Sequence, residues 1–135
     1  MVIKAIVPVV VFLLWSGLGA VAMSGELEQF PILPGAIEKP CGDDEAGICR
    51  ESPVLRFEIR SAEKPGTMVK KMLLLSRKKG WKMNRVTGTP EPRYQSTNGK
   101  KFDLLWAVEK AGRDKGLRGR DETVYHIFYW KVYGD

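Results

Sequence analysis

From position 54 the chain alternates between apolar and charged side chains. In an extended segment, one side would carry three apolar residues: Leu55, Phe57 and Ile59. The opposite side would carry three charged residues: Arg56, Glu58 and Arg60. A period of two is the pattern of a strand that is buried on one face. The sequence therefore predicts a half-buried strand over residues 54–60.

Residues 67–80 change to a helical period. Apolar side chains recur at i, i+1, i+4, i+5 and i+7 and form one stripe: Met68, Val69, Met72, Leu73 and Leu75. Thr67 is the expected N-cap and Gly80 the expected end. Three basic residues fall in the last turn, where the helix dipole favours cations: Arg77, Lys78 and Lys79. We therefore expect an amphipathic helix here.

The chain between 81 and 116 is read as three segments. Residues 81–86 return to an extended pattern, with Trp81 and Met83 on one face. Residues 87–101 contain two prolines and an Asn-Gly pair, which are typical of a loop. Residues 102–116 are predicted to form a second helix, with Leu105 and Val108 near one stripe and Gly116 at its end.

The last segment, residues 123–133, is rich in β-branched and aromatic residues and predicts a strand. One face would carry four apolar residues: Val124, Phe128, Trp130 and Val132. The other would carry three tyrosines and one isoleucine: Tyr125, Ile127, Tyr129 and Tyr133. A strand that is apolar on both faces is usually central in its sheet. The alternative is that the tyrosine face stays partly open for a partner.

These elements follow the order strand, helix, strand, helix, strand, with a further short strand considered near Leu117. We therefore expect an α+β fold, in which two helices pack on one face of a small mixed or antiparallel sheet. Residues 54–135 would form this domain. Residues 23–53, which contain most of the prolines of the mature chain, would form an extended arm.

The first 22 residues resemble an export signal. Between Ala5 and Ala22 no residue is charged, and the strongest apolar part, residues 5–15, has the length of a signal-peptide core. Ala20-Val21-Ala22 fits the small-x-small pattern of signal peptidase, which predicts cleavage after Ala22. The alternative is an uncleaved N-terminal anchor. We expect an exported protein, periplasmic or extracellular, with no membrane span after cleavage.

Export determines how the two cysteines are interpreted. Cys41 and Cys49 are an even pair close in sequence, which in an oxidising compartment predicts a structural disulfide. The enclosed acids Asp43, Asp44 and Glu45 lack the ligand spacing of a calcium loop, so a solvated acidic turn is favoured. Two cysteines and one histidine cannot build a structural zinc site unaided. No metal or cofactor is expected.

Charge is distributed unevenly along the chain. Residues 23–65 contain five basic and nine acidic side chains, whereas residues 66–135 contain sixteen basic and seven acidic ones. In an exported protein this balance favours anionic neighbours, such as a lipid or polymer surface, nucleic acid or an acidic protein. The alternative is that lysine and arginine only solubilise exposed faces.

No convincing catalytic set is present. The chain contains none of the G-x-S-x-G, phosphate-loop or H-E-x-x-H motifs. His126 is the one histidine and is expected to be a buried, hydrogen-bonded residue of the last strand. The alternative is a ribonuclease-like hydrolase with His126 and Glu58 as acid and base and Arg60 or Arg56 as the phosphate ligand.

Two basic stretches are candidates for contact with an anion. Trp81 lies among Lys78, Lys79 and Lys82, which is typical of a site that joins a cation and an aromatic ring. The favoured interpretation is that Trp81 packs inside. The Gly-containing turn at residues 113–120 is the better candidate and contains four basic residues: Arg113, Lys115, Arg118 and Arg120.

The segments "GTMVKKMLLLSRKKGW" and "NGKKFDLLWAVEKAG" resemble the short N-terminal domain of secretins and TonB-dependent transducers, and of related pilus and type IV secretion proteins. The resemblance spans about residues 66–133. It implies a periplasmic protein–protein adaptor of two helices and several strands, and it brings no catalytic residues with it. Where that family has an Ala-Leu pair in its second helix, this chain has Leu104-Leu105-Trp106-Ala107.

The sequence thus favours an exported, non-enzymatic binding domain that docks to an envelope or secretion-machinery protein. The expected contacts are the basic turn and the tyrosine face of the last strand: Arg113, Lys115, Arg118, Arg120, Tyr125, Tyr129 and Tyr133. The alternatives are a small secreted toxin or effector and a basic secreted hydrolase acting on an anionic substrate.

Overall fold

The computed structural model describes residues 27–97, 101–116 and 119–133. The chain divides into two compact units, Met1–Phe30 and Pro31–Asp135. In the described part of the first unit, the Phe30 amide donates to the Leu27 carbonyl at 3.0 Å. The predicted signal segment, residues 1–22, lies outside the described residues. The second unit holds the sheet and the helix that packs on it.

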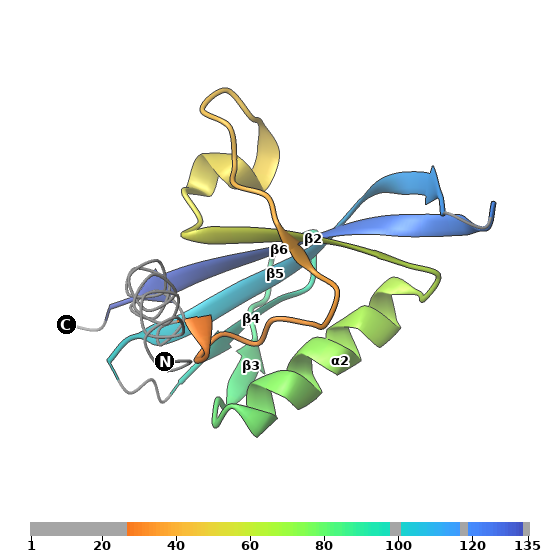
Figure 1. Cartoon of the computed structure of the whole chain (residues 1–135). Helices are drawn as coiled ribbons and strands as arrows, with labels where there is room; N and C mark the ends of the chain where they lie inside the picture. Colours follow the sequence, from red (N-terminus) through yellow and green to blue (C-terminus); the bar gives the residue numbers. More distant parts are fainter. Residues whose placement is uncertain (1–26, 98–100, 117–118, 134–135) are drawn as a thin grey trace, which may run out of the picture. The chain divides into compact units, whose positions relative to one another are not determined.

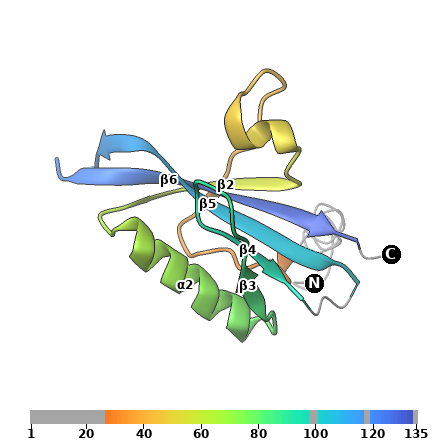
Figure 2. The ribbon, with the colours of Figure 1, turned by 180° about the vertical axis from the view of Figure 1, so that it is seen from behind.

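The sheet has six strands in the order β1-β2-β6-β5-β4-β3, and each neighbouring pair is antiparallel. The strands are β1 (Ile37–Glu38), β2 (Leu55–Ser61), β3 (Met83–Arg85), β4 (Arg93–Ser96), β5 (Asp103–Lys115) and β6 (Asp121–Val132). One α-helix of the described residues, α2 (Pro65–Lys78), connects β2 to the opposite edge of the sheet at β3 (Figures 1 and 2). The fold is therefore mostly sheet.

The predicted second helix over 102–116 is wrong, because this segment is the long strand β5. Its side chains alternate between the two faces of the sheet, and Leu104, Trp106 and Val108 are all buried on one of them. Ala107 is buried on the other face, so the segment is apolar on both sides. The predicted order of strand, helix, strand, helix, strand with two helices on the sheet is wrong for the same reason. Gly116 lies at the β5–β6 turn and ends no helix.

The first helix is confirmed, although its start differs from the prediction. Its N-cap is Lys64 rather than Thr67, and the helix begins at Pro65. Pro65 suits the first turn because proline lacks the amide hydrogen that would have no partner there. Gly80, with φ of +87°, follows the helix and lets the chain turn away. The predicted loop 87–101 contains β4, which pairs with β5 through Arg93 and Ala107.

The central position predicted for the last strand is confirmed. β6 pairs with β2 on one side and with β5 on the other, in a register that sets Phe57 opposite Ile127 and Trp106 opposite Tyr129. A β-bulge interrupts the β5–β6 ladder between Lys110 and Gly112. Beyond it the two strands continue as a ribbon to the β5–β6 turn.

Two layers cover the two faces of the sheet (Figure 1). On the α2 face, the indole nitrogen of Trp106 donates to the Ser76 hydroxyl at 3.1 Å, and Ser76 in turn donates to the Met72 carbonyl at 2.7 Å. On the outer face, the short 3-10 helix η1 (Gly47–Glu51) places Ile48 against Ala107, Phe128 and Trp130. The predicted extended arm from Pro31 onward therefore belongs to the second unit, together with the sheet.

Candidate functional site

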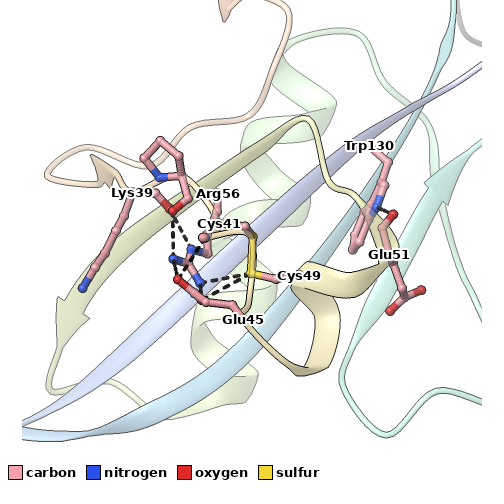
Figure 3. The surroundings of a disulfide bond; sticks show 9 residues. Lys39, Cys41, Glu45, Cys49, Glu51, Arg56 and Trp130 are labelled. Carbon is pink, nitrogen blue, oxygen red and sulfur yellow. Dashed lines mark hydrogen bonds and ion pairs between the residues drawn. A yellow bond between two sulfur atoms is a disulfide. The ribbon is translucent and has the colours of Figure 1, made fainter.

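The predicted disulfide is confirmed. Cys41 and Cys49 are bonded, and their Cα atoms lie 5.6 Å apart (Figure 3). We call the segment around this bond, residues 39–53, the disulfide lobe. Cys41 and Cys49 pack against the apolar cluster around Phe128 on the outer face of the sheet. No cluster of metal-ligating side chains occurs in the described part of the chain.

Arg56 anchors the first half of the disulfide lobe. Its side chain is only 4% exposed, and its guanidinium donates to the Lys39 carbonyl at 2.7 Å and to the Pro40 carbonyl at 3.1 Å. It also forms a two-pronged ion pair with Glu45, at 2.5 and 2.9 Å (Figure 3). The hydrogen bonds from Arg56 and from the Gly42 amide lower the pKa of Glu45 from 4.5 to about 2. Glu45 of the acidic turn is therefore the partner of Arg56.

Arg93 anchors the other end of the lobe. Its guanidinium donates to both oxygens of Glu51 at 2.8 and 2.9 Å and to Glu91 at 2.9 and 2.5 Å. It also lies over the ring of Trp130, 4.9 Å from the centroid, and the Trp130 indole donates to the Glu51 carbonyl at 3.0 Å. The hydrogen bonds from Arg93 lower the pKa of the Glu51 carboxyl. With both ends held, the lobe is a fixed cover of the outer face.

The structure brings together the acid and base of the hydrolase hypothesis. Glu58 on β2 and His126 on β6 are register partners, and Oε1 of Glu58 lies 3.2 Å from Nε2 of His126. The hydrogen bonds with His126 and Lys39 lower the pKa of Glu58. The two proposed phosphate ligands are engaged elsewhere, because Arg56 holds the lobe and Arg60 pairs with Asp114 at 2.8 Å.

The tyrosine face predicted for the last strand is mostly buried. Tyr125 and Tyr129 are fully buried, and their hydroxyls donate to the carbonyls of Glu63 and Pro31, the latter at 2.7 Å. Burial raises the pKa of both phenols. Tyr133 alone is open, with 68% of its side chain exposed. As folded, Tyr125 and Tyr129 are core residues that cannot touch a partner.

The predicted basic turn is exposed but mixed in charge. Arg113, Lys115 and Arg120 are all exposed, whereas Arg118 lies outside the described residues. The β5–β6 register places acids among them, setting Lys115 opposite Asp121 and Asp114 opposite Glu122. The turn therefore offers an anion less net positive charge than its arginines and lysines alone indicate.

Trp81 is buried, which confirms the interpretation that it packs inside. Its ring lies 5.6 Å from that of Phe102. Lys78, Lys79 and Lys82 remain exposed near the end of α2. The basic stretch therefore contributes cations, but no aromatic ring, to the surface.

An open groove of about 540 Å³ runs beside α2. Seven residues line it, and we call it the α2 groove: Leu33, Pro34, Lys71, Leu74, Leu75, Arg77 and Lys78. Leu74 is 63% exposed, which is unusual for a leucine in the middle of a helix. Sequence reasoning did not select this groove. The available signal was the uninterrupted apolar run from Met72 to Leu75, since the core stripe accounts for its other members and leaves Leu74 outside.

A tight turn forms the second wall of the α2 groove. The Ala36 amide donates to the Leu33 carbonyl at 3.2 Å, with Pro34 and Gly35 as the two central residues. Gly35 has φ of +84°, which a type II turn requires at that position and which other residues rarely adopt. The hydrogen bond from Tyr129 to the Pro31 carbonyl holds the same segment to the sheet. The wall is therefore preformed.

Comparisons with known protein families, with curated proteins and with solved structures found no match. The resemblance to the secretin and TonB-transducer domain is untested by them, and the second helix that it implies is β5 in this structure. Within the described residues, no helix is both long and apolar enough to cross a membrane.

Proposed function

We propose that this protein is an exported, non-enzymatic binding domain that docks a protein partner through the α2 groove. The observation that carries the proposal is the exposed Leu74 in an apolar groove with preformed walls. A solitary exposed leucine needs no explanation, but Leu74 adjoins Leu33, Pro34 and Leu75 in one hollow. Such a hollow with polar margins is the form of site that holds an apolar anchor of a partner.

Two further features support export and a binding role. The Cys41–Cys49 disulfide suits an oxidising compartment, in agreement with the predicted signal segment. The disulfide lobe is held at both ends by buried arginines, so it stabilises the outer face. This leaves the α2 side as the favoured docking surface.

The proposal is tested by co-purification from the native cells with three forms of the tagged protein: wild type, Leu74→Glu and Ile37→Glu. Ile37 is a matched control, because it is 71% exposed and lies on β1 at the edge of the sheet rather than in the groove. We expect a partner that co-purifies with the wild type and with Ile37→Glu but not with Leu74→Glu. A partner retained equally by all three forms would contradict docking through the groove.

A hydrolase remains a second candidate, favoured by the 3.2 Å contact between Glu58 and His126. Its reaction would use these two side chains as acid and base on an anionic ester such as RNA. The test is cleavage of RNA by the purified protein in the presence of a chelator. Cleavage that His126→Gln abolishes would favour the hydrolase, and cleavage that survives this change would exclude His126 from the reaction.

A further inference from the structure

Leu74 is surrounded on the helix surface by positive charge. Side chains three and four residues apart are neighbours on a helix, and all four such neighbours of Leu74 are basic: Lys70, Lys71, Arg77 and Lys78. An exposed leucine with basic neighbours on both sides therefore suits a partner that supplies both apolar and acidic groups.

Most of this charge has no acidic partner among the residues that the structure describes. Lys71 pairs with Glu63 at 2.6 Å, but no ion pair found among the described residues involves Lys70, Arg77 or Lys78. None of the seven residues that line the groove is acidic. Arg77 and Lys78 also lie in the last turn of α2, where the helix dipole offsets some of their mutual repulsion. The groove margin is thus available to carboxylates.

The shape of the site favours a protein segment over a lipid surface. The apolar residues lie in a hollow between the helix and the turn at Pro34, whereas a helix that binds a bilayer presents a broad apolar face outward. On α2 most of the apolar stripe is turned inward, since Met68, Val69 and Met72 are buried. An apolar hollow with a charged margin fits the side chains of an amphipathic peptide.

We infer, on the basis of the proposed docking function, that the α2 groove binds an acidic amphipathic segment of a protein partner. Apolar side chains of that segment would lie on Leu74, Leu75 and Pro34. Its carboxylates would face Lys70, Arg77 and Lys78. Complementary charge of this kind speeds association and makes binding sensitive to salt.

The test uses two synthetic amphipathic helical peptides of one length, each labelled with a fluorophore. Both carry leucine at i and i+4, one with glutamate and the other with lysine at the remaining exposed positions. We expect the purified protein to bind the glutamate peptide at least about tenfold more tightly than the lysine peptide, as measured by fluorescence anisotropy. Raising the ionic strength from about 0.05 M to about 0.5 M should weaken that binding about fivefold or more.

Variants locate the binding on the protein. The double change Arg77→Glu with Lys78→Glu should weaken binding of the glutamate peptide about tenfold or more. The matched control is Lys110→Glu with Arg113→Glu, which makes the same charge change on exposed positions of the β5–β6 ribbon and should leave binding within about twofold. Circular dichroism and thermal unfolding confirm that each variant is folded.

The outcomes separate the inference from the proposed function. If both peptides bind equally and Leu74→Glu weakens both, the groove docks a partner but the acidic preference is wrong. If Leu74→Glu weakens neither peptide, docking through the groove is wrong as well. Binding to phosphatidylglycerol vesicles without binding to either peptide would overturn the protein-segment inference in favour of a lipid surface.

Discussion

The Arg56 guanidinium forms a bidentate ion pair with the Glu45 carboxylate, with Nη1 2.5 Å from Oε2 and Nη2 2.9 Å from Oε1. Arg56 is a buried residue of β2, and Glu45 lies inside the ring closed by the disulfide. The pair therefore joins the only covalent crosslink of the chain to the central part of the sheet. A charged residue in an otherwise ordinary strand pattern has a structural role here.

Arg56→Met should destabilise the protein by roughly 1–3 kcal/mol, because two carbonyls and a carboxylate lose their donor. Urea unfolding followed by tryptophan fluorescence measures this change. Arg60→Met is the matched control, since Arg60 lies on the same face of β2 in a solvent-exposed pair with Asp114. It should change the free energy of unfolding by less than about 1 kcal/mol. Equal effects of the two changes would contradict the anchoring role of Arg56.

The protein should lose stability as the pH falls from about 5 towards 2. The folded pKa of Glu45 is lowered from 4.5 to about 2, so the native state binds fewer protons than the unfolded state in that range. The lowered pKa values of Glu51 and Glu58 act in the same direction. Stability is thus fully present above about pH 5 and is lost progressively on acidification.

Glu45→Gln tests this acid sensitivity. The variant should be less stable than the wild type near pH 7, and its stability should fall less steeply between pH 5 and pH 2. Urea unfolding at a series of pH values gives both quantities. An acid slope identical to that of the wild type would exclude Glu45 as a source of the pH dependence.

Reduction of the disulfide should lower the free energy of unfolding by roughly 2–3 kcal/mol, as expected for the short ring between Cys41 and Cys49. Because the lobe covers Trp130, reduction should also raise the accessibility of that indole to a quencher such as iodide. The double variant Cys41→Ser with Cys49→Ser is the control and should not respond to the reductant. A wild type whose stability is unaffected by the reductant would show that the lobe needs no crosslink.

Tyr129→Phe should destabilise the protein by about 1–2 kcal/mol, because the buried Pro31 carbonyl would lose its donor. The same change should weaken docking, since this bond holds the turn that forms one wall of the α2 groove. Tyr133→Phe is the matched control just after the same strand, and it should leave stability unchanged because Tyr133 is exposed. Thermal unfolding of the two variants compares them directly, and equal midpoints would contradict the assignment of Tyr129 to the core.

Sequence reasoning predicts the elements whose hydrophobic pattern fits only one kind of secondary structure. Residues 55–60 alternate between apolar and charged side chains, and α2 has an apolar stripe at helical spacing, so the sequence predicts both elements. Strand β5 has no such pattern, because Trp106 is buried on one face and Ala107 on the other. An apolar run of that kind fits a helix and a doubly covered strand equally well. Pairing with β4 and β6 makes this segment a strand, and that pairing depends on residues that are distant in the sequence.

In the candidate site, too, the sequence predicts the features that depend on local residues and misses those that depend on tertiary contacts. The disulfide is predictable from two cysteines and an export signal. The tyrosine face is not, since alternation cannot tell which face of β6 the helix will cover. The ring of basic residues around Leu74 is visible in the sequence once α2 is known. The opposite wall of the groove at Leu33 and Pro34 comes from a segment distant in the chain, and only the folded structure brings it to α2.

The most direct test of docking through the α2 groove is photo-crosslinking in the native cells. A benzophenone amino acid is placed at position 74 and, as a control, at position 37, which is also largely exposed. We predict a discrete adduct with one partner from position 74, absent from position 37 and lost when Arg77 and Lys78 are changed to glutamate. The same adducts from both positions, or none from position 74, would contradict the account.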